Sequence, residues 1–112
     1  MNADYPRDAD ATAAERRDYE RSRIILNVHF DGAELTGVAN TRDMSLGGLY
    51  MNTRAQLPEG ATLTLRIPFG AESEAIVTAQ VMYVNPGIGV GLRFVALSER
   101  DRLVLERELT PS

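Results

Sequence analysis

Residues 75–94 read AIVTAQVMYVNPGIGVGLRF, and this stretch decides the fold. Apolar residues recur at every second position from Ala75 to Tyr83, and again from Ile88 to Phe94, where Gly89, Gly91 and Arg93 lie between them. The triplet Asn85-Pro86-Gly87 between the two runs is typical of a tight turn. A period of two places successive side chains on opposite faces of a β-strand. The stretch therefore predicts two strands joined by a turn, each with one buried face, and it places Tyr83 in the core.

Shorter segments upstream repeat this alternation, over residues 24–30, 34–40, 49–52 and 62–67. Turn-forming residues separate them at Asp31-Gly32, at 42–48 and at Pro58-Glu59-Gly60. We expect Pro68 to end the strand before it, because proline donates no hydrogen bond to a sheet.

The period changes near Ser98. Ser98 and Asp101 form an N-terminal capping pattern, and an apolar stripe of Leu103, Val104 and Leu109 predicts a short helix. About six strands at a spacing of ~8–12 residues, followed by one helix, predict a small closed barrel or sandwich rather than alternating βαβ units.

Composition limits the function. The 112 residues are 44% hydrophobic, which suits a single domain with one core. There is no cysteine and one histidine, His29, which we expect on the surface. These residues supply no nucleophile–base pair and no metal cluster, so we expect neither an enzyme nor a metal site. The lack of cysteine, of a secretory signal and of an apolar run near ~20 residues predicts a cytoplasmic chain without membrane insertion.

Charge is informative as well. The formal net charge is −4, which argues against binding nucleic acid through a basic face, and the chain has twelve arginines and no lysine. Residues 1–14 are polar and acidic, and we predict a flexible arm there, followed by one domain over 15–112. Four of the twelve arginines fall within residues 16–23.

Two clusters stand out as candidate binding residues: Arg17-x-x-x-Arg21 and Asp43-x-Ser45-x-x-Gly48. Arginine forks pair bidentately with phosphate, stack on rings and read one edge of guanine. A carboxylate suits the N–H donors of the other guanine edge, and glycine permits close backbone approach or a positive φ. A barrel mouth would bring the two clusters together. The pair points to a ligand with phosphates and planar bases.

These residues resemble the PilZ domain, the bacterial receptor for cyclic di-GMP, whose pattern is RxxxR followed after a strand pair by [D/N]xSxxG. The resemblance covers about residues 15 to 109, including GIGVGLRF at 87–94 and the helix opening LSERD at 97–101. It implies a six-stranded antiparallel β-barrel with a C-terminal α-helix.

The resemblance also implies a binding site and a role. Arg17 and Arg21 would grip phosphates and guanine faces, and a guanine would be surrounded by Asp43, Ser45 and Gly48. Arg93 is a weaker candidate on the outer face of the barrel. Arg16, directly before RxxxR, suits two ligand molecules per chain. The chain would be an adaptor without a cofactor, in which cyclic di-GMP orders the arginine segment and changes the surface that an unidentified downstream protein contacts.

Other readings stay open. The arginines of residues 16–23 alone suit a solvated linker paired with its own acids, and Asp43 and Ser45 commonly cap turns. Met44 and Met51 suit core packing. A PilZ-like protein-interaction module without nucleotide is the alternative function, and a small barrel for single-stranded nucleic acid would need a basic groove with exposed aromatics.

Overall fold

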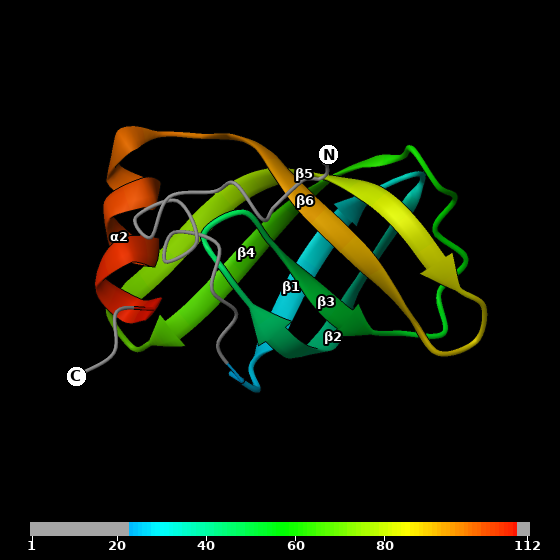
Figure 1. The fold of residues 1–112 in the computed structure, drawn as a ribbon, viewed down its shortest axis with the longest axis horizontal. Coiled ribbons are helices and arrows are strands. Elements are labelled where there is room, and N and C mark those ends of the chain that lie inside the picture. The colour runs from blue at the N-terminus through cyan, green and yellow to red at the C-terminus, as the bar shows by residue number, and fades with distance from the viewer. Residues whose placement is uncertain (1–22, 110–112) are drawn as a thin grey trace, which may run out of the picture.

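The computed structural model describes residues 23–109, which form a closed barrel of six antiparallel strands and one helix (Figure 1). The predicted arm at 1–14 lies outside the described residues. The elements are β1 (Asn27–Gly32), β2 (Leu35–Met44), β3 (Gly48–Asn52), β4 (Thr62–Gly70), β5 (Ser73–Asn85), β6 (Gly89–Leu97) and α2 (Glu99–Leu109). The strand order is β1-β2-β3-β6-β5-β4, and β1 pairs with β4 to close the barrel. The predicted fold is therefore confirmed.

The barrel interior is filled by the apolar faces that alternation predicts. Val28 and Phe30 of β1 are buried while His29 between them is exposed, and β4 and β5 show the same pattern. Met44 and Met51 are fully buried, as expected of packing residues. Helix α2 packs against β5 at one end of the barrel (Figure 1), where Val104 and Leu105 are buried.

Several predicted boundaries are wrong, because strand pairing overrides local turn signals. Asp31 and Gly32 belong to β1, and the turn falls on Ala33 and Glu34, whose φ angles of 54° and 65° are left-handed. Two successive left-handed residues match the twist of a tight hairpin. The first strand begins at Asn27 rather than at position 24. Strand β2 continues through Met44, so the motif turn is shorter than predicted.

Proline does not end β4. Pro68 pairs with Glu74 of β5 but lies beyond Arg66, the last β4 residue paired with β1. With a neighbour on one side only, a residue without an N–H is tolerated.

Three apolar residues predicted to face the core are exposed instead. A β-bulge between Val81 and Tyr83 inserts Met82, which moves Tyr83 to the outer face, where it is 48% exposed. Ile88 lies in the turn before β6, and Leu103 faces away from the barrel, where Leu105 takes the predicted buried place.

The helix is capped as predicted. The Asp101 N–H donates to Ser98 Oγ at 3.1 Å, and Ser98 Oγ donates to Asp101 Oδ2 at 2.6 Å. The N–H of Ile76 on β5 donates to Asp101 Oδ1 at 3.0 Å, which ties the helix to the barrel. Burial acts most strongly and would raise the pKa of Asp101, but hydrogen bonds from Ser98, Ile76 and Arg100 outweigh it, so the pKa lies below its ordinary value. No described helix has the length and apolar character needed to cross a membrane.

Candidate functional site

The Ser45–Gly48 turn joins β2 to β3, and Ser45 holds it together. The Ser45 N–H donates to the Gly48 carbonyl at 2.8 Å, and the Gly47 N–H donates to Ser45 Oγ at 3.1 Å. The side chain is 2% exposed. Ser45 therefore caps the turn, as one reading of the sequence expected, and its contact with a ligand stays a prediction.

Gly48 is required by close packing rather than by a positive φ. A Cβ at this position would collide with the Leu92 carbonyl oxygen and would lie 3.1 Å from the Arg93 Cα. The φ of Gly48 is not positive. The positive φ that the sequence left open is therefore not observed, and close approach of a ligand to this backbone stays a prediction.

Strand pairing places Asp43 in a row with residues far away in the sequence. Asp43 pairs with Tyr50 of β3, Tyr50 with Gly91 of β6, and Gly91 with Tyr83 of β5. Partners in antiparallel strands project on the same side of the sheet. This row lies on the outer face, because the residues beside it, Leu49 and Leu92, belong to the core cluster.

Arg93 lies in the next row of the same face. It pairs with Gly48 of β3 and with Gln80 of β5, and its Nη2 donates to Gln80 Oε1 at 3.4 Å. The structure thus brings Arg93 beside the motif turn. We call these two rows, made of Asp43, Tyr50, Gly91, Tyr83, Gly48, Arg93 and Gln80, the motif face.

Arg42 is a candidate that sequence reasoning missed. It is the extra residue of a bulge between Thr41 and Asp43. Its guanidinium carbon lies 4.0 Å from the centroid of the Tyr50 ring, and its Nε donates to Asp43 Oδ2 at 3.4 Å. Tyr83 continues the layer, with its ring centroid 6.1 Å from that of Tyr50.

The signal for this aromatic layer lay in two glycines. A Cβ at Gly89 would lie 2.7 Å from the Tyr50 ring, and a Cβ at Gly91 would collide with the Tyr83 ring. Glycines at alternate positions of a strand mark close approach of other groups to its backbone. The rings that approach them depend on strand register, which the sequence alone did not specify.

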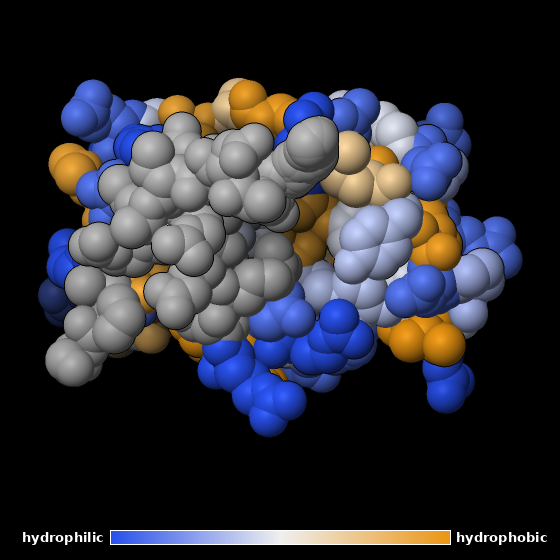
Figure 2. Space-filling model, viewed as in Figure 1, coloured by the Kyte–Doolittle hydropathy of each residue, from blue (hydrophilic) through white to orange (hydrophobic). Residues whose placement is uncertain are grey.

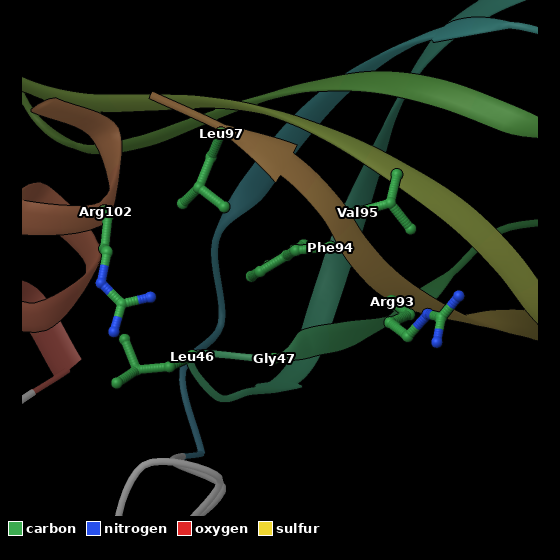
Figure 3. Close-up of a pocket in the computed structure, with 7 residues that line it drawn as sticks. All are labelled: Leu46, Gly47, Arg93, Phe94, Val95, Leu97 and Arg102. Carbon is green, nitrogen blue, oxygen red and sulfur yellow. The ribbon is translucent and has the colours of Figure 1, made fainter. Parts of the chain in front are cut away.

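Two hollows border the motif face. The Asp43 hollow has a volume of about 310 Å³ and is lined by Arg42, Asp43, Leu49, Met82, Tyr83, Gly91 and Leu92. The turn hollow, of about 500 Å³, is lined by Leu46, Gly47, Arg93, Phe94, Val95, Leu97 and Arg102 (Figure 3). Figure 3 shows Arg102 reaching from α2 toward Leu46, while Arg93 points away from them. In the face that Figure 2 shows, the described surface is mostly hydrophilic, with separate apolar patches.

The chain enters the barrel next to Asp43. The Leu26 N–H donates to Thr41 Oγ1 at 3.0 Å, the Thr41 N–H donates to the Leu26 carbonyl at 2.8 Å, and Thr41 Oγ1 donates to the Ile24 carbonyl. Thr41 is two residues before Asp43. Three predicted site residues, Arg16, Arg17 and Arg21, precede this entry and lie outside the described residues. Within residues 23–109, no group of three acidic, histidine or cysteine side chains is placed to hold a metal ion.

Solved structures with the same fold share little sequence with this chain. The Bacillus subtilis inhibitor of motility, MotI/DgrA, superposes with a TM-score of 0.69 at 20% identity, over 82% of this chain. The chain spans about half of that protein, 48% of its length. The PilZ domain of CeSA from a cellulose-synthesizing bacterium gives 0.63 at 20% identity, over 79% of this chain and 92% of that domain.

A third similar structure is the Borreliella burgdorferi PlzA protein in complex with c-di-GMP. Its TM-score is 0.60 at 11% identity, over 89% of this chain and 38% of that protein. A search of curated protein sequences gave no match. The family model described as "PilZ domain" matches residues 15–110, which is most of the sequence. The chain therefore belongs to the PilZ domain family.

Proposed function

We propose that the chain is a cytoplasmic sensor of cyclic di-GMP that binds this nucleotide on the motif face and acts as an adaptor rather than as an enzyme. The observation that carries the proposal is the placement of Asp43, Gly48 and Arg93 on one outer face, beside the point where the chain enters the barrel. The PlzA relative, solved with the same nucleotide, supports it.

The chemistry of the motif face suits this ligand. Cyclic di-GMP carries two phosphate charges and two guanines. Asp43 supplies an acceptor for the N–H edge of a guanine, and Arg93 supplies donors for a phosphate or for the opposite guanine edge. Ser45 holds the turn through its own hydrogen bonds, and we expect a flat base to approach the backbone of this turn.

We propose that Arg17 and Arg21 complete the site. The Ile24 carbonyl accepts a hydrogen bond from Thr41 Oγ1, and Arg21 precedes Ile24 by three positions. Three residues span at most about 11 Å, so connectivity supports a meeting of Arg21 with a ligand at Asp43. Binding would order residues 15–23 on the barrel and change the surface offered to a downstream protein.

Calorimetric titration of the full chain with cyclic di-GMP tests this function. We expect saturable binding. Absence of binding would contradict the proposal and favour a PilZ protein-interaction module that takes no nucleotide.

Arg16 extends the proposal to stoichiometry. Two stacked ligands bring four phosphate charges into one site, and an additional guanidinium offsets part of that charge. We therefore expect a titration ratio near two, which falls toward one in Arg16→Leu. A wild-type ratio of one, unchanged in the variant, would leave Arg16 as a solvated charge.

A further inference from the structure

Tyr83 occupies an unusual place for an aromatic residue on a barrel surface. Its ring covers the backbone of Gly91, where a Cβ would collide with ring atoms. The centroid of the Tyr50 ring lies 6.1 Å from the centroid of the Tyr83 ring. The residue is nevertheless 48% exposed. A large ring that is fixed from below and open to solvent above is a ready stacking surface.

The same ring lines the Asp43 hollow. That hollow is lined by Arg42 and Asp43 of β2 and by Met82 and Tyr83 of β5, together with Leu49, Gly91 and Leu92. Its volume of about 310 Å³ is enough for one purine base. In the row that joins Asp43 to Tyr83, Gly91 contributes no side chain, and the Tyr50 ring is buried under the Arg42 guanidinium.

We propose that Tyr83 is a base-stacking residue of the nucleotide site: a guanine in the Asp43 hollow places its flat face on the Tyr83 ring and its N–H edge toward Asp43. This inference rests on the proposed function and adds a residue outside both motifs. Stacking recognises any planar base, whereas the carboxylate accepts from guanine N–H groups. Tyr83 therefore contributes affinity and Asp43 contributes the choice of base.

Arg42 supports this arrangement from the far side. Its guanidinium lies over the Tyr50 ring and within 3.4 Å of Asp43 Oδ2, so it holds the carboxylate at the edge of the hollow. Arg42 acts through Asp43 and Tyr50, which makes it a positioning residue.

The test compares four full-length variants with the wild type by calorimetric titration with cyclic di-GMP. Tyr83→Ala removes the ring and should weaken binding about 5- to 150-fold, the range measured for loss of one stacking partner. Tyr83→Phe keeps the ring and should bind within about twofold of the wild type. Tyr83→Leu keeps apolar cover over Gly91 without a π-system, and should resemble Tyr83→Ala. Ile76→Ala is the matched control, because Ile76 lies on the same strand and is similarly exposed at 45%.

The outcomes distinguish failure of the stacking role from failure of the proposed function. Wild-type binding with an unchanged affinity in folded Tyr83→Ala would overturn the stacking role and leave the sensor function standing. Full recovery in Tyr83→Leu would also overturn it, because cover of Gly91 would then be the whole contribution. If the wild type binds no cyclic di-GMP, the function and the stacking role both fail. A parallel titration with cyclic di-AMP should show weaker binding that Tyr83→Ala reduces further.

Discussion

Two regions of the outer surface of this barrel differ in the residues that line their hollows. On the side of β1 and β4, strand pairing sets Val38, His29, Arg66 and Ile76 in one row, which we call the β1–β4 face. The hollow there is larger, about 530 Å³ against about 310 Å³ for the Asp43 hollow. Its lining combines apolar side chains with polar ones, and one of these, Arg66, forms a surface ion pair with Glu74 at 3.7 Å.

In the motif face, by contrast, side chains from different strands contact one another. Glycines admit the Tyr83 ring and the β6 backbone, and Arg42 bridges a ring and a carboxylate. We therefore place the proposed site at the smaller hollow, by its chemistry rather than by its volume. What distinguishes the motif face is that Arg42 contacts both the Tyr50 ring and the Asp43 carboxylate beside the motif turn.

The largest expected effect is a loss of ligand affinity when an arginine near the motif face is removed, compared with removal of an arginine on the β1–β4 face. Arg21→Ala should reduce cyclic di-GMP affinity more than about 100-fold while leaving the fold intact, since a bidentate arginine–phosphate pair combines two charge-assisted hydrogen bonds. Arg66→Ala is the matched control on the β1–β4 face and should bind as the wild type does. Equal loss in both variants would mean that binding follows net charge rather than the motif face.

The second effect concerns stability. Gly48→Ala should lower the free energy of unfolding by about 2–3 kcal/mol, because the new methyl group meets the fixed Leu92 carbonyl of a paired strand. Gly70→Ala should change it by less than about 0.5 kcal/mol, because that position is open and its φ is not positive. Urea denaturation measures both. A Gly48→Ala protein as stable as the wild type would show that β3 and β6 separate easily.

Asp101 allows stability and binding to be separated. Asp101→Ala should cost about 1–2 kcal/mol at neutral pH through loss of the cap and of the Ile76 tie, without changing ligand affinity. Because the folded-state pKa is lowered, the ionised carboxylate stabilises the fold above the unfolded pKa. That stabilisation is lost as the pH falls through the folded value. The difference in unfolding free energy between wild type and variant should therefore shrink below about pH 4. A constant difference down to pH 2 would contradict the ionic cap.

The smallest effect is at Arg93. Arg93→Ala should weaken cyclic di-GMP binding about fivefold, the value of one modest hydrogen bond, because the side chain is exposed and already bonded to Gln80. Fluorescence polarisation with labelled nucleotide resolves a change of this size. An affinity within error of the Arg66→Ala control would remove Arg93 from the site.

The sequence predicted the strands of this barrel because apolar residues recur at every second position wherever the strands pair regularly. It predicted the buried faces of β1 and β4 and the Ser98 cap. It failed at Tyr83 because a bulge adds one residue and reverses every side chain beyond it. It also misplaced the first turn, because the pairing of Gly32 with Leu35 extends the strands past Asp31.

Part of the candidate site could be predicted from a local sequence pattern, and part could not. Asp43, Ser45 and Gly48 lie within six residues, so a motif reveals them. The stack of Arg42, Tyr50 and Tyr83 depends on the register of four strands, which no local pattern encodes.

Hydrogen exchange of the full chain with and without cyclic di-GMP tests the central claim most directly, because it reports on both faces at once. The account predicts that ligand slows exchange in residues 15–23, in the turn and strand at 43–50, and at 89–93, with no change at 35–38 or 64–66. Unchanged exchange at residues 15–23 and 43–50 at saturating nucleotide, or equal slowing over the β1–β4 face, would contradict the assignment of the motif face as the sensor site.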